Sequence, residues 1–175
     1  ALVAGTAGLG PLANLPPVDS DEQVIVGLGN PETRYAGTPH NVGYEVVERL
    51  ALSWGLSWDM TPEALIARGS AEGKNVCLVK IQTAMNLTGS GLKHLSESMA
   101  FSPEQCILVF DDLDLPISAV KTRIKGGAGG HRGVASVLEA FQTDAIRRVK
   151  VGVGKAGGKL DRVTYVLTAF DEESR

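Results

Sequence analysis

Short apolar segments alternate along this chain with segments in which apolar residues recur at helical spacing. The short segments, rich in β-branched residues, predict strands at residues 24–28, 64–69, 75–81, 106–110, 120–124 and 148–152. The helical spacing predicts helices at residues 41–54, 87–99 and 131–141, and residues 163–167 start a further short strand or helix. This alternation, without internal repeats, predicts one α/β domain with a mixed, mostly parallel central sheet and helices on both faces.

Length and composition favour a single folded unit. With 175 residues, of which 43% are hydrophobic, the chain is long enough to bury about two-thirds of its unfolded surface. Residues 1–22 are rich in glycine, alanine and proline and show no period, which predicts a linker-like tail before a domain at residues 23–175. The absence of an initiator methionine and the charged end at residues 171–175 suggest a piece cut from a longer chain, although processing would leave the same ends.

Two features bear on the compartment. No apolar run approaches the roughly 20 residues of a membrane-spanning helix, and residues 1–15 lack the basic flank of a signal peptide. Cys77 and Cys106 stand in apolar surroundings without a CxxC spacing, which predicts buried free thiols and fits a reducing compartment. We therefore expect a soluble, cytoplasmic protein that does not bind membranes.

The basic residues are unevenly distributed. The formal net charge is −3, but residues 119–162 hold ten basic residues against three acidic ones, a local charge of +7. The basic residues of this segment are Lys121, Arg123, Lys125, Arg132, Arg147, Arg148, Lys150, Lys155, Lys159 and Arg162. A segment of this kind suits a partner rich in phosphate.

Two residues could supply acid–base chemistry. His40 precedes a predicted helix, where it is either a structural histidine or a general base that works near neutral pH. Asp111 ends an apolar strand, where a carboxylate could orient an imidazole. Asp111, Asp112 and Asp114 could equally be turn and capping residues, or ligands of a cation.

Two further segments lie where a strand leads into a helix. Asn86 either caps the following helix or places an amide donor beside a reacting carbonyl, and Asn41 is a favoured cap for its own helix. Residues 126–130 are four glycines and an alanine, which form either a flexible lid or a loop whose amides face an anion. His131 and Arg132 follow this loop and favour a phosphate or a peptide carbonyl as its ligand.

Other familiar catalytic patterns are missing from the sequence. Residues 27–29 read Gly-Leu-Gly after a strand, but Glu32 occupies the third glycine position of a dinucleotide fingerprint and Pro31 interrupts the turn. The chain contains no GxSxG elbow, no Walker lysine motif and no HExxH.

Four motifs follow one another along the chain. They are residues 27–31 with Tyr35 and 38–43, then residues 85–89, then 111–116, and then 129–131. Taken together and in this order, they resemble the bacterial-type peptidyl-tRNA hydrolase family. The resemblance spans roughly residues 24–170, and the combination is specific where one motif alone would not be. It implies a compact monomeric α/β domain with a mixed sheet, no metal and no cofactor, acting on peptidyl-tRNA.

The resemblance also implies roles for individual residues. His40 would be the base that activates water, and Asp111 would be the carboxylate that orients His40. Asn86 would help to stabilise the reacting ester. The remaining substrate-binding positions would be Asn30, Tyr35, Met85, His131 and Arg132. Lys121, Arg123 and Lys125, in the basic half of the chain, would bind the tRNA backbone.

The sequence departs from the family pattern at several positions. Pro39 stands where the family usually has arginine, Ala84 where it has an aromatic residue, and Ile81 where it has proline. Arg132 replaces the asparagine that usually follows the glycine-loop histidine. The sequence also ends where the family normally continues into a helix that closes the site, which is the pattern of a divergent or fused member.

Three functions are compatible with these observations. The leading hypothesis is hydrolysis of the ester between tRNA and a peptide or N-blocked amino acid. The second is a non-catalytic RNA-binding relative, favoured by Arg132 and the early end of the sequence. The third is a repurposed hydrolase-like domain of a larger protein, suggested by residues 1–22.

Overall fold

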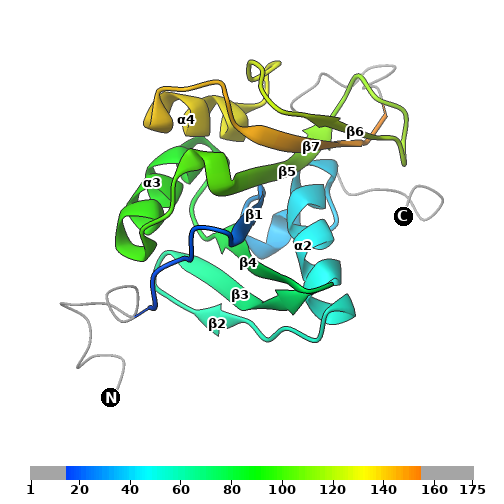
Figure 1. Ribbon diagram of the computed structural model, residues 1–175. Coiled ribbons are helices and arrows are strands. Elements are labelled where there is room, and N and C mark those ends of the chain that lie inside the picture. The colour runs from blue at the N-terminus through cyan, green and yellow to red at the C-terminus, as the bar shows by residue number, and fades with distance from the viewer. Residues whose placement is uncertain (1–14, 155–175) are drawn as a thin grey trace.

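The structure, a computed structural model, describes residues 15–154 (Figure 1). The strands are β1 (Gln23–Gly27), β2 (Asp59–Met60), β3 (Ala64–Ala71), β4 (Lys74–Ile81), β5 (Cys106–Asp112), β6 (Val120–Arg123) and β7 (Arg147–Gly152). The α-helices are α2 (Val42–Ser53), α3 (Thr88–Met99) and α4 (Arg132–Phe141). Short 3-10 helices are η2 (Thr33–Tyr35), η3 (Pro39–Asn41), η4 (Met85–Leu87) and η5 (Pro103–Gln105).

The seven strands form one mixed sheet in the order β2-β3-β4-β1-β5-β7-β6. The four central strands run parallel, through the pairs β4·β1, β1·β5 and β5·β7. The two edges are antiparallel, through β2·β3 and β3·β4 on one side and β6·β7 on the other. The carboxyl ends of the central strands therefore meet at one edge of the sheet, where loops can bring distant residues together.

Helices cover both faces of the sheet, as predicted. On one face α3 and α4 pack against each other and against inward residues such as Val24 and Val26 of β1 (Figure 1). On the other face α2 packs over β1, β4 and β5, and Ala51 buries itself against Leu78. Strand residues alternate between the two cores because successive side chains of a strand point to opposite faces.

A close backbone approach fixes α2 on the sheet. A Cβ on Gly43, near the start of α2, would collide with the carbonyl oxygen of Val109 in β5 and with the backbone of Leu28 just after β1. The Leu28 amide donates to that same Val109 carbonyl at 2.9 Å. Glycine at position 43 thus lets the helix begin directly over the junction of β1 and β5.

Part of the segment expected to be a linker-like tail packs against the domain. Val18 is buried in the larger core cluster, and its amide donates to the carbonyl of Met99 at 2.7 Å. Glu22, also buried, accepts from the Arg68 guanidinium at 2.7 and 2.9 Å. Arg68 also donates to the carbonyls of Pro16 and Pro17, which ties this stretch to β3.

The predicted elements agree with the structure to within a few residues at each end, and the predicted 163–167 element lies outside the described residues. Both cysteines are free and buried, as expected. The expectation that Asn41 caps its helix is wrong. Asn41 occupies the N-cap position, but its side chain bonds to the backbone of Asn30 instead. No helix within residues 15–154 is long and apolar enough to cross a membrane.

The glycine contact predicts a large effect of one methyl group. Gly43→Ala should lower the free energy of unfolding by about 3 kcal/mol, because the added Cβ would push α2 away from two strands. Gly127→Ala is the control: a Cβ there meets no atom within 4 Å, so stability should change by less than about 0.5 kcal/mol. Urea denaturation of both variants measures this, and equal stabilities would contradict the packing account.

Candidate active site

A cavity of about 390 Å³ opens at the carboxyl edge of the central strands. Its walls come from the end of β5, from the loops that follow β1, β4, β5 and β6, from β7, and from the start of α4. The lining includes every residue predicted for catalysis or substrate binding, namely Asn30, Tyr35, His40, Met85, Asn86, Asp111, His131 and Arg132. The four motifs, far apart in sequence, thus form one site.

His40 and Asp111 form a buried pair in this cavity. His40 lies in η3, just before α2, and Asp111 lies near the end of β5. The Nδ1 of His40 is 2.8 Å from Oδ1 of Asp111, so Nδ1–H donates to the carboxylate. A neutral ring bonded in this way carries its lone pair on Nε2, which is the arrangement that a general base needs.

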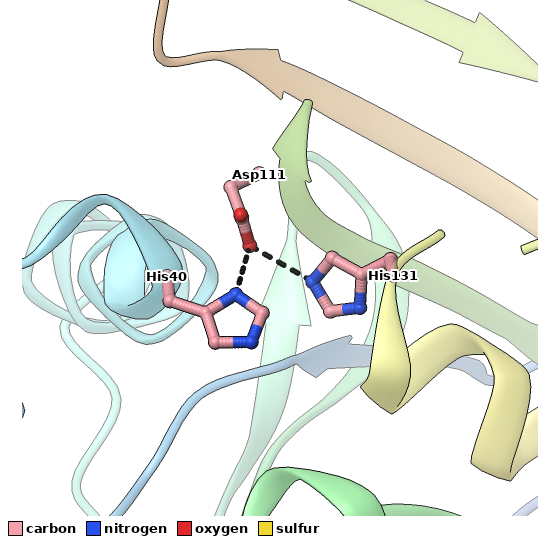
Figure 2. Close-up of side chains that lie close together, drawn as sticks. All are labelled: His40, Asp111 and His131. Carbon is pink, nitrogen blue, oxygen red and sulfur yellow. Dashed lines mark hydrogen bonds and ion pairs between the residues drawn. The ribbon is translucent and has the colours of Figure 1, made fainter. Parts of the chain in front are cut away.

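His131 bonds to the same carboxylate oxygen (Figure 2). Its Nε2 lies 2.8 Å from Oδ1 of Asp111, and its ring centroid is 4.7 Å from that of His40. His131 is also the N-cap residue of α4, and its Nδ1 accepts from the amides of Gly133 and Val134 at 3.1 and 3.2 Å. These two amides therefore face an imidazole rather than an open anion site.

The two histidines keep Asp111 ionised. Burial alone would raise the pKa of this carboxyl, but hydrogen bonds from His131 and His40 outweigh it and hold the pKa well below its usual range. An ionised Asp111 both orients His40 and stabilises the imidazolium that forms when His40 takes a proton.

The same three side chains lie close enough to hold a metal ion, since their ligand atoms are within 4.8 Å of one another. The hydrogen bonds of His131 oppose this use. A neutral histidine that ligates through Nε2 carries its hydrogen on Nδ1, yet the Nδ1 of His131 accepts two backbone N–H groups. The trio is suited to holding and moving protons.

Asn30 is held so that its side-chain NH₂ group is available to a ligand. The side chain of Asn41 bonds twice to the backbone of Asn30. Its Oδ1 accepts from the backbone N–H at 2.7 Å, and its Nδ2 donates to the backbone carbonyl at 2.8 Å. The side-chain oxygen of Asn30 accepts from the Met85 amide at 3.1 Å. The remaining polar group of Asn30 is its NH₂, a donor in a residue that lines the cavity. Asn41 was missed as a site residue because its sequence context is that of an ordinary helix cap.

The other predicted residues lie around the cavity. Asn86 is exposed in η4, and since the N-cap position of α3 belongs to Leu87, Asn86 does not cap that helix. Met85 is buried and Tyr35 is half-buried, with the Arg34 guanidinium over its ring. Arg132 is exposed at the first position of α4.

A buried cation, Arg148, anchors the start of the glycine loop. Arg148 is 1% exposed and donates to the carbonyls of Gly127, Asp144 and Ile146. The amide of Gly126 bonds to the same Asp144 carbonyl at 3.0 Å. The loop therefore has a fixed base, and Gly129 and Gly130, both with positive φ, turn the chain into α4.

The residues predicted to bind tRNA are exposed but lie outside the cavity. Lys121 and Arg123 are in β6, and Lys125 follows it. Lys121 pairs with Lys150 of β7, and directly opposed residues of an antiparallel pair project to the same face. Lys150 lines the cavity, so a basic row leads from the site across β7 to β6. Basic and apolar residues alternate in β7, from Arg148 to Val151, and this pattern is the sequence signal that could have identified Lys150.

The lining residues among those described include no serine, threonine or cysteine. Fold and site together define an α/β protein with a histidine–aspartate pair and amide donors around an open cavity. In such an arrangement the histidine can act as a general base on water, which is a chemistry used by hydrolases.

Comparisons with known proteins agree with that class. A family model described as Peptidyl-tRNA hydrolase matches residues 24–175. The peptidyl-tRNA hydrolase of Aquifex aeolicus is 41% identical over 155 residues, covering 87% of this chain and 80% of that protein. The Bacillus subtilis peptidyl-tRNA hydrolase is 38% identical over 151 residues, covering 86% and 80%. The crystal structure of the Acinetobacter baumannii peptidyl-tRNA hydrolase matches with a TM-score of 0.82 at 31% identity, covering 90% and 81%.

The chain therefore belongs to the peptidyl-tRNA hydrolase family. This confirms the resemblance carried by the four sequence motifs and the predicted α/β class with a mixed sheet.

The low pKa of Asp111 predicts how stability depends on pH. A carboxyl whose pKa is depressed on folding stabilises the fold above its unfolded value of about 3.9, and this stabilisation is lost as pH falls further. In Asp111→Asn, the free energy of unfolding should fall less steeply than in the wild type between about pH 4.5 and pH 2.5. Asp59→Asn, at an exposed position in β2, should keep the wild-type slope. Urea titrations across this range decide, and a wild-type slope in Asp111→Asn would contradict the account.

Proposed function

We propose that this protein hydrolyses the ester bond between tRNA and a peptide or N-blocked amino acid, with His40 as the base. The observation that carries the proposal is the bond between His40 Nδ1 and Asp111, which leaves the lone pair of Nε2 in a residue that lines the cavity. Membership of the family supports the same reaction.

The reaction needs only one water and the groups around the cavity. His40 Nε2 takes a proton from water, and the water oxygen attacks the ester carbonyl carbon. Asp111 stabilises the imidazolium. The bond from the carbonyl carbon to the ribose oxygen then breaks, and His40 returns its proton to that oxygen. The products are a free peptide and a tRNA with a free hydroxyl.

Amide donors stabilise the charge that develops on the ester oxygen. The side-chain NH₂ of Asn30 is the better oriented donor, because the side-chain oxygen of the same residue accepts from the backbone N–H of Met85. Asn86 lines the same cavity from η4 and supplies a second amide. Donors placed before the reaction stabilise a transition state without reorganising, which is the source of their catalytic effect.

The two parts of the substrate would bind on different sides of the reacting ester. The peptide would contact Tyr35, Met85 and Arg132, which line the cavity. The tRNA backbone would follow the basic row from Lys150 to Lys121 and Arg123, with Lys125 at its end. We expect the protein to act as a monomer in the cytoplasm, where two free cysteines persist.

The alternative of a non-catalytic RNA-binding relative is disfavoured by the site itself. Such a protein has no use for a buried, ionised carboxylate bonded to an imidazole at the wall of a cavity. Arg132, which departs from the family pattern, lies at the cavity wall and affects substrate contacts rather than the His40–Asp111 pair.

Loss of the base should abolish turnover and spare binding. In His40→Ala, kcat for release of an N-blocked amino acid from charged tRNA should fall by about 10³-fold, while tRNA affinity stays within a few-fold. His94→Ala is the matched control, because His94 is an exposed residue of α3 that is bonded to Glu63 and does not line the cavity. A near-normal rate in His40→Ala would remove His40 from the mechanism.

Removing a cation from the basic row should change the salt dependence of tRNA binding. Lys121→Ala and Arg123→Ala should each weaken binding and flatten the slope of log affinity against log salt by about one unit. Lys74→Ala, at the amino end of β4 and far along the sheet from the cavity, should leave the slope unchanged. Slopes equal to the wild type in both variants would place the RNA on another surface.

A further inference from the structure

Two imidazoles compete for one oxygen of Asp111. His40 Nδ1 and His131 Nε2 each lie 2.8 Å from the same Oδ1, and all three residues are buried. Two donors on one oxygen divide its negative charge between them. The attraction that Asp111 exerts on His40 is therefore weaker than it would be without His131.

The N-terminus of α4 decides which form of His131 takes part. The first amides of a helix have no partner within the helix and seek an acceptor. Here Gly133 and Val134 find it in the Nδ1 of His131. Because Nδ1 accepts, the hydrogen of the neutral ring lies on Nε2, and Nε2 points at Asp111 (Figure 2).

We propose that His131 is a positioning residue that acts through Asp111. The helix end holds it as a neutral Nε2–H donor, which shares the Asp111 oxygen and so limits how strongly Asp111 stabilises protonated His40. His131 thereby keeps His40 unprotonated, and active as a base, to a lower pH. This role rests on the proposed function, and it differs from the direct substrate contact that the family resemblance implies for His131.

Other charged and titratable groups also face the pair. They are Glu32 and Tyr35 from the segment after β1, Asp112 and Asp114 at the end of β5, Arg132 of α4 and Lys150 of β7. Lys150 lies 3.9 Å from Asp112. A test of His131 must leave all of them in place, which a substitution at position 131 alone does.

Two substitutions separate the two hydrogen bonds of His131. The Oδ1 of asparagine occupies the place of Nδ1, so His131→Asn keeps the helix cap but does not reach Asp111. The amide nitrogen of glutamine occupies the place of Nε2, so His131→Gln keeps the donor to Asp111 but loses the cap. The pair thus assigns each effect to one bond.

The decisive measurement is the pH profile of kcat/KM for an N-blocked aminoacyl-tRNA. In His131→Asn, the midpoint of the acid limb should move up by about half a unit to one unit, because Asp111 then stabilises protonated His40 more strongly. In His131→Gln the midpoint should stay near the wild type, while the melting temperature falls by about 3 °C. An unmoved midpoint in His131→Asn, or equal shifts in both variants, overturns the proposal. A rise in KM alone in His131→Asn also overturns it, because that is the signature of a substrate contact.

A second measurement does not depend on turnover. Long-range ¹H–¹⁵N spectra of the substrate-free protein at pH 8 should show His131 with its hydrogen on Nε2 and His40 with its hydrogen on Nδ1. A His131 that carries its hydrogen on Nδ1 overturns the proposal. If His131 and His40 of the wild type each show the expected tautomer but the protein does not hydrolyse the ester, the proposed function is overturned while the arrangement of the two rings stands.

Discussion

The hydrogen bonds to Asp111 are the contacts on which the site depends. They join residues 71 and 20 positions apart in the sequence, and they connect η3, β5 and the N-terminus of α4 at one point. A buried carboxylate is costly unless its charge is met by donors, and here two imidazoles meet it. The carboxylate in turn favours a hydrogen on Nδ1 of His40, and together with the amides at the start of α4 it favours a hydrogen on Nε2 of His131.

The fold brings these groups together through backbone contacts. Gly43 lets α2 begin against Val109 and Leu28, and His40 lies three residues before this contact while Asp111 lies two residues after Val109. On the other side, Arg148 holds the base of the glycine loop whose far end is His131. The positions of His40 and His131 around Asp111 are thus supported from opposite faces of the sheet.

Much of this arrangement could be predicted from the sequence, because β-branched runs and helical spacing act locally. Every strand and helix predicted within the described residues is present, although the short strand β2 was not predicted, and every predicted catalytic or substrate-binding residue lines one cavity. Asn41 shows the limit of such reasoning. Its position is that of a helix cap, but the chain brings the backbone of Asn30 within reach, and bonds to that backbone replace the cap.

The sequence by itself determined the element order, the α/β class and the set of polar residues at the ends of strands, since these follow from local pattern and from motif spacing. Only the tertiary structure decided how those polar residues pair. Hydrogen-bond partners depend on which strand ends lie side by side and on which backbone amides are left unpaired at a helix end. For that reason the sharing of one Asp111 oxygen by His40 and His131 could not be predicted from the sequence.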